Sequence, residues 1–156
     1  NKALGGDEES YFQAVARSFM VSADNAHSVH PNYTEKADPC NRPMVNKGVV
    51  IKYNANQKYT TDAVSGAVFK SFCEKAKVPF QCFTNRSDML GGSTLGNISN
   101  SQVALNTVDI GLPQLSMHSP YETAGVEDTY YLVEVAKLFY SSSVLGRGDG
   151  NLEIRY

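Results

Sequence analysis

The stretch VVIKYNANQKYTTDAVSGAVFKSFCEKAKVPFQCF, residues 49–83, carries the alternation that predicts the fold. Residues 49–53 are an apolar run of strand length, and a turn signal of asparagines follows it. A helical pattern then covers about 62–77, and a second apolar run of strand length covers 79–83. The stretch therefore predicts a strand, a helix and another strand.

The helix in this stretch has a predicted start and a predicted buried face. Thr60 or Thr61 is expected to cap it, because a hydroxyl oxygen can accept from the free N–H groups of the first turn. Val64, Val68 and Phe72 recur every four residues and so form one apolar stripe along the helix. We expect that stripe to face the core.

The same alternation continues on both sides of this stretch. Helices are predicted at about 7–17, 97–103 and 126–142, and strands at 19–21 and 107–111. Strands that alternate with helices indicate an α/β domain with a largely parallel or mixed sheet and helices on both faces. Residues 25–47 are polar and contain three prolines, so we expect a long loop, a kind of segment that is often functional.

The composition predicts an ordered globular domain and disfavours two classes of partner. Of the 156 residues 42% are apolar, and the net charge is −2. There is no basic cluster for a nucleic acid and no apolar run near the roughly 18 residues that span a bilayer. Cys40, Cys73 and Cys82 have irregular spacing, which predicts free thiols and a reducing cytoplasm.

The candidate ligands for a metal are an aspartate and the chain's three histidines. Asp24 follows a predicted buried strand, and His27 and His30 come three and six residues later. His118 follows the strand at 107–111, so it could meet Asp24 above the same sheet edge. Carboxylate and imidazole are zinc ligands, but scattered histidines are also ordinary in a domain of this size. Both interpretations stay open on the residues alone.

A glycine-rich segment, GGSTLG at 91–96, precedes the helix predicted at 97–103. Its backbone N–H groups could hold a carboxylate or a developing oxyanion. A plain tight turn is an equally good interpretation. The segment lacks the Gly-Lys-Ser/Thr ending of a phosphate-binding loop, so nucleotide binding is disfavoured.

Two longer motifs carry a family resemblance. SADNAHSVHPNY at 22–33 and QLSMHSPYE at 114–122 resemble the two signatures of the M18 family, the aspartyl aminopeptidases. VVIKYN at 49–54 and Tyr59 also match the family's spacing. The similarity covers about 10–143, so residues 1–143 are interpreted as the C-terminal portion of an M18 catalytic domain and 144–156 as a tail of unclear origin.

The resemblance implies an incomplete three-layer sandwich of the phosphorylase/hydrolase-like zinc peptidase type. It implies two divalent metal ions, with zinc expected, and a metal-dependent aminopeptidase that removes N-terminal residues from peptides. Lys52 suggests a preference for acidic residues. Carried over position by position, the resemblance gives as metal ligands Asp24 and His118, as substrate contacts His27, Lys52 and Tyr59, and as supporting residues His30, Gly92 and Thr94.

The chain departs from the family pattern in what it contains. The resemblance also calls for a histidine ligand, a bridging aspartate, an adjacent Glu-Glu pair with the general base, and an inserted second domain, and these 156 residues include none of them in context. We therefore expect no catalytic residue here and no activity from this chain alone. The expected partners are the remainder of the same protein and a homo-oligomer, dodecameric in the family. A non-catalytic assembly or binding module is the alternative function.

Overall fold

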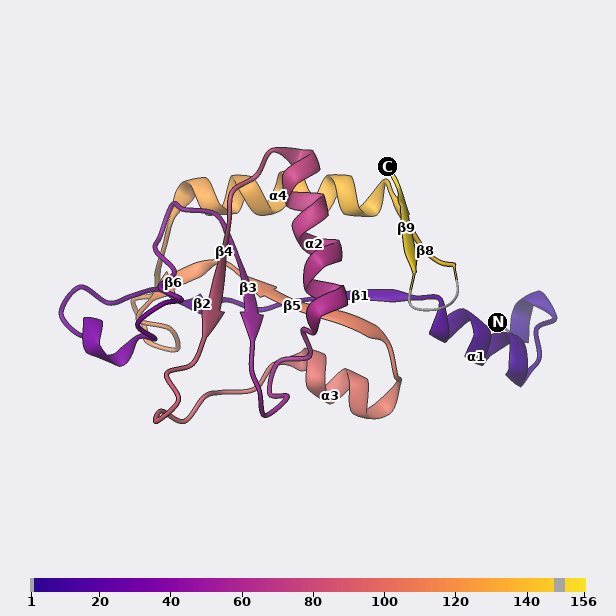
Figure 1. Cartoon of the computed structure of the whole chain (residues 1–156), viewed down its shortest axis with the longest axis horizontal. Helices are drawn as coiled ribbons and strands as arrows, with labels where there is room; N and C mark the ends of the chain where they lie inside the picture. Colours follow the sequence, from indigo (N-terminus) through magenta and orange to yellow (C-terminus); the bar gives the residue numbers. More distant parts are fainter. Residues whose placement is uncertain (1, 148–150) are drawn as a thin grey trace.

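The computed structural model describes residues 2–147 and 151–156 (Figure 1). Its helices are α1 (Glu8–Ala16), α2 (Ala63–Ala76), α3 (Leu95–Gln102) and α4 (Val126–Tyr140), with short 3₁₀ turns at Lys2–Leu4 and Thr34–Lys36. Its strands are β1 (Phe19–Ala23), β2 (Ala26–His27), β3 (Val49–Tyr53), β4 (Phe80–Thr84), β5 (Asn106–Gly111), β6 (Pro113–Leu115), β7 (Thr123–Ala124), β8 (Ser143–Gly146) and β9 (Leu152–Arg155). The four helices and the four strands β1, β3, β4 and β5 occur where the sequence predicts them. The short strands β2, β6, β7, β8 and β9 were not predicted, and β2 lies within the segment 25–47 that was expected to be a loop.

The main sheet is mixed, with the strand order β1-β5-β3-β4. β1 runs parallel to β5 and β3 runs parallel to β4, whereas β3 and β5 are antiparallel. A smaller sheet, β2-β6-β7, continues from the ends of β1 and β5. The α/β prediction with a mixed sheet is confirmed.

The larger core lies between one face of the main sheet and the helices α2 and α4. Val49 and Ile51 of β3 alternate with residues of the opposite face and are fully buried. Phe69 and Phe72 of α2 and Val135 of α4 pack against them. The opposite face carries a second apolar cluster of Ala26, Val50, Tyr59 and Phe83. β3 is therefore buried on both faces, which explains its continuous apolar sequence.

The start of α2 corrects two details of the sequence interpretation. The N-cap is Asp62, not a threonine: its Oδ1 accepts from the backbone N–H of Ser65 at 2.7 Å, and Ser65 Oγ in turn accepts from the Asp62 N–H. This reciprocal pair satisfies two otherwise free N–H groups. Val64 is 46% exposed, because it lies on the solvent side of the first turn, while Val68 and Phe72 are buried.

The loop that enters β3 is held by a buried carboxylate. Asp128, in the first turn of α4, is 0% exposed, and its two oxygens accept from the backbone N–H groups of Asn46 at 2.6 Å and Gly48 at 2.8 Å. Asn46 and Gly48 both have positive φ values, 58° and 108°. The carboxylate thus stabilises a turn with an uncommon backbone shape directly before the central strand.

The two ends of the described chain differ in how they pack. α1 contains no buried residue and lies at one end of the molecule in Figure 1. The hairpin β8–β9 packs Val144, Leu152 and Ile154 on the main core, so residues 144–147 and 151–156 of the predicted tail are joined to the domain. Residues 1 and 148–150 lie outside the described residues. Along the described ranges, no helix has the length and apolar character to cross a membrane.

Candidate functional site

Asp24 lies in the turn between β1 and β2, and His27 is the last residue of β2. The Asp24 backbone N–H donates to Ile110 O at 3.0 Å, which extends the pairing of β1 with β5 by one residue. The chain then crosses to the small sheet, where His27 pairs with Gln114 of β6. Both side chains are exposed at this end of the sheet. The fold therefore presents the two residues at the ends of parallel strands, where α/β sheets place their ligands.

Lys52 lies beneath this turn. Its side chain is only 2% exposed, and Nζ donates to Asp24 O at 2.8 Å and to Asn25 O at 3.4 Å. Nζ also lies 3.9 Å from Asp24 Oδ2. Burial lowers the pKa of Lys52, while the charges of Asp24 and Asp109 act to raise it. The substrate contact of Lys52 stays a prediction; the contacts seen here are with the backbone that carries Asp24.

His118 lies on a loop with uncommon backbone angles. His118 and Ser116 have φ values of 67° and 56°, a region that non-glycine residues rarely adopt. The His118 backbone N–H donates to Glu122 Oε1 at 2.6 Å, a charge-assisted hydrogen bond that helps to hold this shape. The imidazole itself is exposed. Outlying backbone angles of this kind often accompany functional loops.

The charges of His118 and Lys52 both act on the imidazole of His27. The pKa of His27 is lowered first by the partial burial of its ring, then by the charges of His118 and Lys52. His118 is therefore close enough to affect His27, although the two residues are far apart in sequence. The sequence prediction that the segments after β1 and β5 meet at one edge agrees with this arrangement.

Tyr59 is buried next to Lys52, in the apolar cluster that also contains Ala26 and Phe83. Its ring is 6% exposed, lies 6.2 Å from the Phe83 ring between centroids, and has Lys52 Nζ 5.1 Å from its own centroid. Burial raises the pKa of Tyr59, and the charges of Asp109 and Asp24 raise it further. The phenol is therefore neutral across the physiological range and can act as a hydrogen-bond donor.

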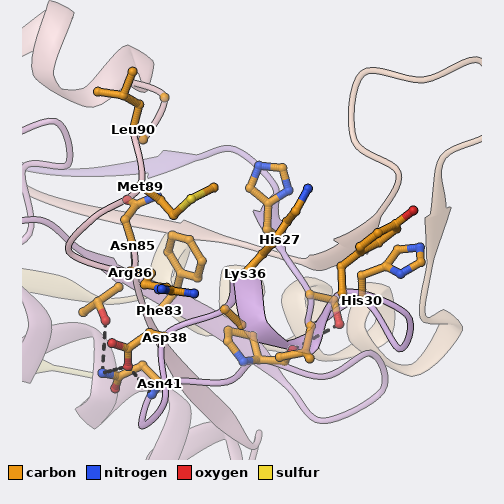
Figure 2. A pocket seen from close by; sticks show the side chains of 18 residues that line it. His27, His30, Lys36, Asp38, Asn41, Phe83, Asn85, Arg86, Met89 and Leu90 are labelled. Carbon is orange, nitrogen blue, oxygen red and sulfur yellow. Dashed lines mark hydrogen bonds between the residues drawn. The ribbon is translucent and has the colours of Figure 1, made fainter.

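A pocket of about 310 Å³ lies beside His27, between the loop that follows β2 and the loop that follows β4 (Figure 2). His30 and Gly92 line it together with His27, and Figure 2 shows His30 across the pocket from Met89. Two cationic side chains, Lys36 and Arg86, also line it. Sequence reasoning did not single out this pair; their position in loops that meet only in the fold is the reason.

Thr94 does not line this pocket. It caps α3 from a buried position, 4% exposed, but its side chain makes no capping hydrogen bond. Among the described residues, Thr94 Oγ1 and Asp109 Oδ1 are the buried side-chain oxygens that have no hydrogen-bond partner. Sequence reasoning passed over Asp109, and the signal that could have found it is a carboxylate in the middle of an apolar strand.

The donor chemistry of Asp24 and His118 suits a divalent metal ion. Both side chains are exposed, and carboxylate oxygen and imidazole nitrogen are ligands that zinc takes. Within the part of the chain that the structure describes, no group of three or more His, Cys, Asp and Glu side chains is placed to hold a metal. A catalytic zinc usually has three protein ligands, so these residues can form only part of such a set.

Comparison with known proteins places this arrangement in one family. The family described as aminopeptidase I zinc metalloprotease (M18) matches residues 2–140. A relative from Clostridium novyi (strain NT), "Probable M18 family aminopeptidase 2", is 53% identical over 139 residues, which are 89% of this chain and 32% of the relative. The chain thus spans about a third of the length of that relative.

Solved structures agree with the sequence comparison. A chain from "Cryo-EM structure of the Ape4 and Nbr1 complex" superposes with a TM-score of 0.83 at 43% identity, over 86% of this chain and 26% of that chain. A chain from "Structure of S. cerevesiae mApe1 dodecamer" has a TM-score of 0.74 at 28% identity, over 83% of this chain and 28% of that chain.

Proposed function

This chain belongs to the M18 family of zinc metalloproteases, and on that premise we propose that it is part of the catalytic domain of a metal-dependent aminopeptidase. The observation that carries the proposal is the family match over residues 2–140, which include every candidate site residue. The positions of Asp24 and His27 at the ends of parallel strands, and the influence of His118 on the pKa of His27, support it. The predicted domain division at residue 143 is part of the same proposal.

Asp24 and His118 are proposed as metal ligands in a site for two divalent ions, with the remaining ligands supplied from outside these 156 residues. A bound zinc would polarise the scissile carbonyl and lower the pKa of a bound water. Lys52 holds the backbone of Asp24 and so orients its carboxylate. With only two candidate ligands, this chain by itself is expected to be inactive.

The pocket beside His27 is proposed to receive part of the peptide substrate. Its charged side chains are Lys36, Asp38 and Arg86, and Arg86 is already ion-paired with Asp88, with 2.7 Å between Nε and Oδ1. Asp38 Oδ1 already accepts from the backbone N–H groups of Cys40 and Asn41. Lys36 is thus the lining cation with no acidic partner among the described ion pairs, and it supports the proposed preference for acidic residues.

The test of the activity is a segment exchange. The 139 residues of this chain that align with the Clostridium novyi relative replace the matching segment of that relative, and the chimera is assayed for zinc-dependent release of N-terminal residues. We expect activity in the chimera, and its loss on Asp24→Ala or His118→Ala but not on Glu74→Ala, a control at an exposed residue of α2 outside the pocket. A folded chimera without activity, or one that keeps activity after both substitutions, would refute the proposal.

Metal binding can be measured directly on this chain. Titration calorimetry with Zn²⁺ should show weak binding that Asp24→Ala and His118→Ala each reduce and that His30→Ala leaves in place. Tight binding that none of these variants changes would mean that other residues hold the metal.

Homo-oligomer formation is the second candidate property, and the solved dodecamer of a relative favours it. Val126, Tyr130 and Tyr140 on the outer side of α4 are 79%, 60% and 85% exposed, which is apolar surface available for contacts. Light scattering on this chain separates the possibilities, since a monomer at all concentrations would argue against assembly through this segment. A cytoplasmic location remains part of the proposal, supported by the three free cysteines.

A further inference from the structure

Asp109 occupies the centre of the main sheet, on the face that carries Lys52. It pairs with Ser22 of β1 in the parallel register. On its other side, the antiparallel pairing of Ile51 with Ile110 brings Lys52 opposite Asp109 when the register is continued by one residue. The carboxylate is 0% exposed. Burying a carboxylate destabilises the folded state unless nearby groups compensate its charge. The groups that contact Asp109 therefore indicate which segments it holds in place.

The first partner is the segment that follows Tyr59. Asp109 Oδ2 accepts from the Thr60 backbone N–H at 2.6 Å and from Thr60 Oγ1 at 2.8 Å. The Asp109 backbone N–H donates to Thr61 Oγ1 at 2.8 Å. Both threonines are therefore tied to one residue of β5, and the position of Tyr59 depends on them.

The second partner is the glycine-rich segment. A Cβ atom added at Gly96 would lie 2.7 Å from each oxygen of Asp109, closer than any real Cβ contact. The carboxylate thus occupies the space that a side chain at Gly96 would need, in the first turn of α3. The helix dipole favours a negative charge at this position. Contact with Asp109 therefore sets where the segment 91–96 lies.

The charge of Asp109 also acts on two candidate site residues. It raises the pKa of Tyr59 and opposes the lowering of the pKa of Lys52 by burial. A single buried side chain thus touches or influences β3, the segment after Tyr59 and the start of α3.

We propose that Asp109 is a positioning residue that joins the Tyr59 segment to the glycine-rich segment 91–96, so that the two keep a fixed separation beside the site. Asp109 does not itself reach the substrate in this role. The importance of the separation for catalysis rests on the proposed aminopeptidase function. The coupling itself requires neither metal nor turnover, so it can fail or hold independently of that function.

Asp128 provides a matched comparison. It is also fully buried and also accepts from two backbone N–H groups, but its partners are Asn46 and Gly48 in the loop before β3. A general loss of stability would follow from removing either carboxylate. Of the two carboxylates, Asp109 is the one expected to connect Thr60 with Gly96, which are 36 positions apart in the sequence. Lys58 Nζ also reaches the glycine-rich segment, donating to Gly91 O at 3.0 Å, but that bond involves neither Thr60 nor Gly96.

The experiment is an NMR measurement of backbone amides in this chain. Gly96→Ala should displace the Asp109 carboxylate and so shift the Thr60 amide resonance. In the Asp109→Ala background, the same Gly96→Ala change should lose most of its effect on Thr60. In the Asp128→Ala background, the effect should be unchanged. An equal shift of Thr60 with and without Asp109, or no shift in the parent, would overturn the proposal.

Hydrogen exchange gives a second readout with a gentler variant. Asp109→Asn keeps one acceptor oxygen but lacks the charge, so the charge-assisted hydrogen bond to the Thr60 N–H becomes an ordinary one. The Thr60 amide should therefore exchange about 10-fold faster than in the parent. Asp128→Asn should instead accelerate Asn46 and Gly48 and leave Thr60 protected. If Asp109→Ala does not fold, this comparison decides alone. Unchanged exchange at Thr60 in Asp109→Asn would overturn the proposal.

Discussion

The carboxylate of Asp128 offers the sharpest test of how the loop before β3 is held. Asp128→Ala removes the acceptor of both the Asn46 and the Gly48 N–H groups. A hydrogen bond to a charged group contributes about 1.5–3 kcal/mol, so the pair contributes about 3–6 kcal/mol. The variant also no longer bears the cost of burying a charged carboxylate, and this gain offsets part of the lost hydrogen-bond energy. We expect a net loss of about 3 kcal/mol in the free energy of unfolding.

Urea unfolding followed by circular dichroism measures this loss. For an m-value of about 2 kcal/mol per molar urea, a loss of about 3 kcal/mol lowers the midpoint by about 1.5 M. Asp128→Asn keeps one acceptor oxygen and should lose about half as much. Glu127→Ala, an exposed residue in the same turn, is the control and should stay within about 0.5 kcal/mol. An Asp128→Ala variant as stable as the Glu127→Ala control would refute this account of the loop.

Four further predictions concern Lys52, Cys73 and Gly48. Lys52→Met should lower the free energy of unfolding by about 2–4 kcal/mol, measured by urea unfolding. The substitution removes the buried ammonium group that interacts with the carboxylates of Asp24 and Asp109, and it leaves the Asp24 carbonyl without its hydrogen-bond donor. Burial raises the pKa of Cys73 to about 12, so at pH 8 a thiol reagent should modify exposed Cys40 and reach Cys73 only on unfolding. For the same reason, the stability contributed by the neutral Cys73 thiol should be complete below the unfolded-state pKa of about 9.0 and should be lost as the pH rises toward about 12. Gly48→Ala should cost more than about 2 kcal/mol, because φ is 108° and the added Cβ would overlap a backbone carbonyl, whereas Gly146→Ala, with open space around it, should change stability little.

The elements that local periodicity specifies were predictable. β3 has the predicted bounds, Val49–Tyr53, because every residue of a strand buried on two faces is constrained to be apolar or paired. The body of α2 was predictable from its apolar spacing, yet its cap was assigned wrongly to a threonine. Thr60 and Thr61 instead bond to Asp109, 49 and 48 residues away. A propensity for capping cannot reveal that a distant carboxylate competes for the same side chain.

The candidate site also contains residues that the sequence predicts and residues that only the fold reveals. Asp24, His27 and His118 were found because they follow strands and lie in recognisable motifs, and the fold brings the segments that carry them together. Their roles stay predictions. The pocket cations Lys36 and Arg86 were missed, because no pattern in either loop indicates that the two loops border one cavity.

The order of strands and helices, the family and the residue types of the site were thus determined by the sequence by itself. Each of these depends on spacing within a short stretch or on a motif that can be read along the chain. Only the tertiary structure decided that Lys52 lies under Asp24 and that Asp109 lies between Thr60 and Gly96. Those contacts join segments that are remote in sequence, and whether a buried charge is paired depends on which segments the sheet register brings together.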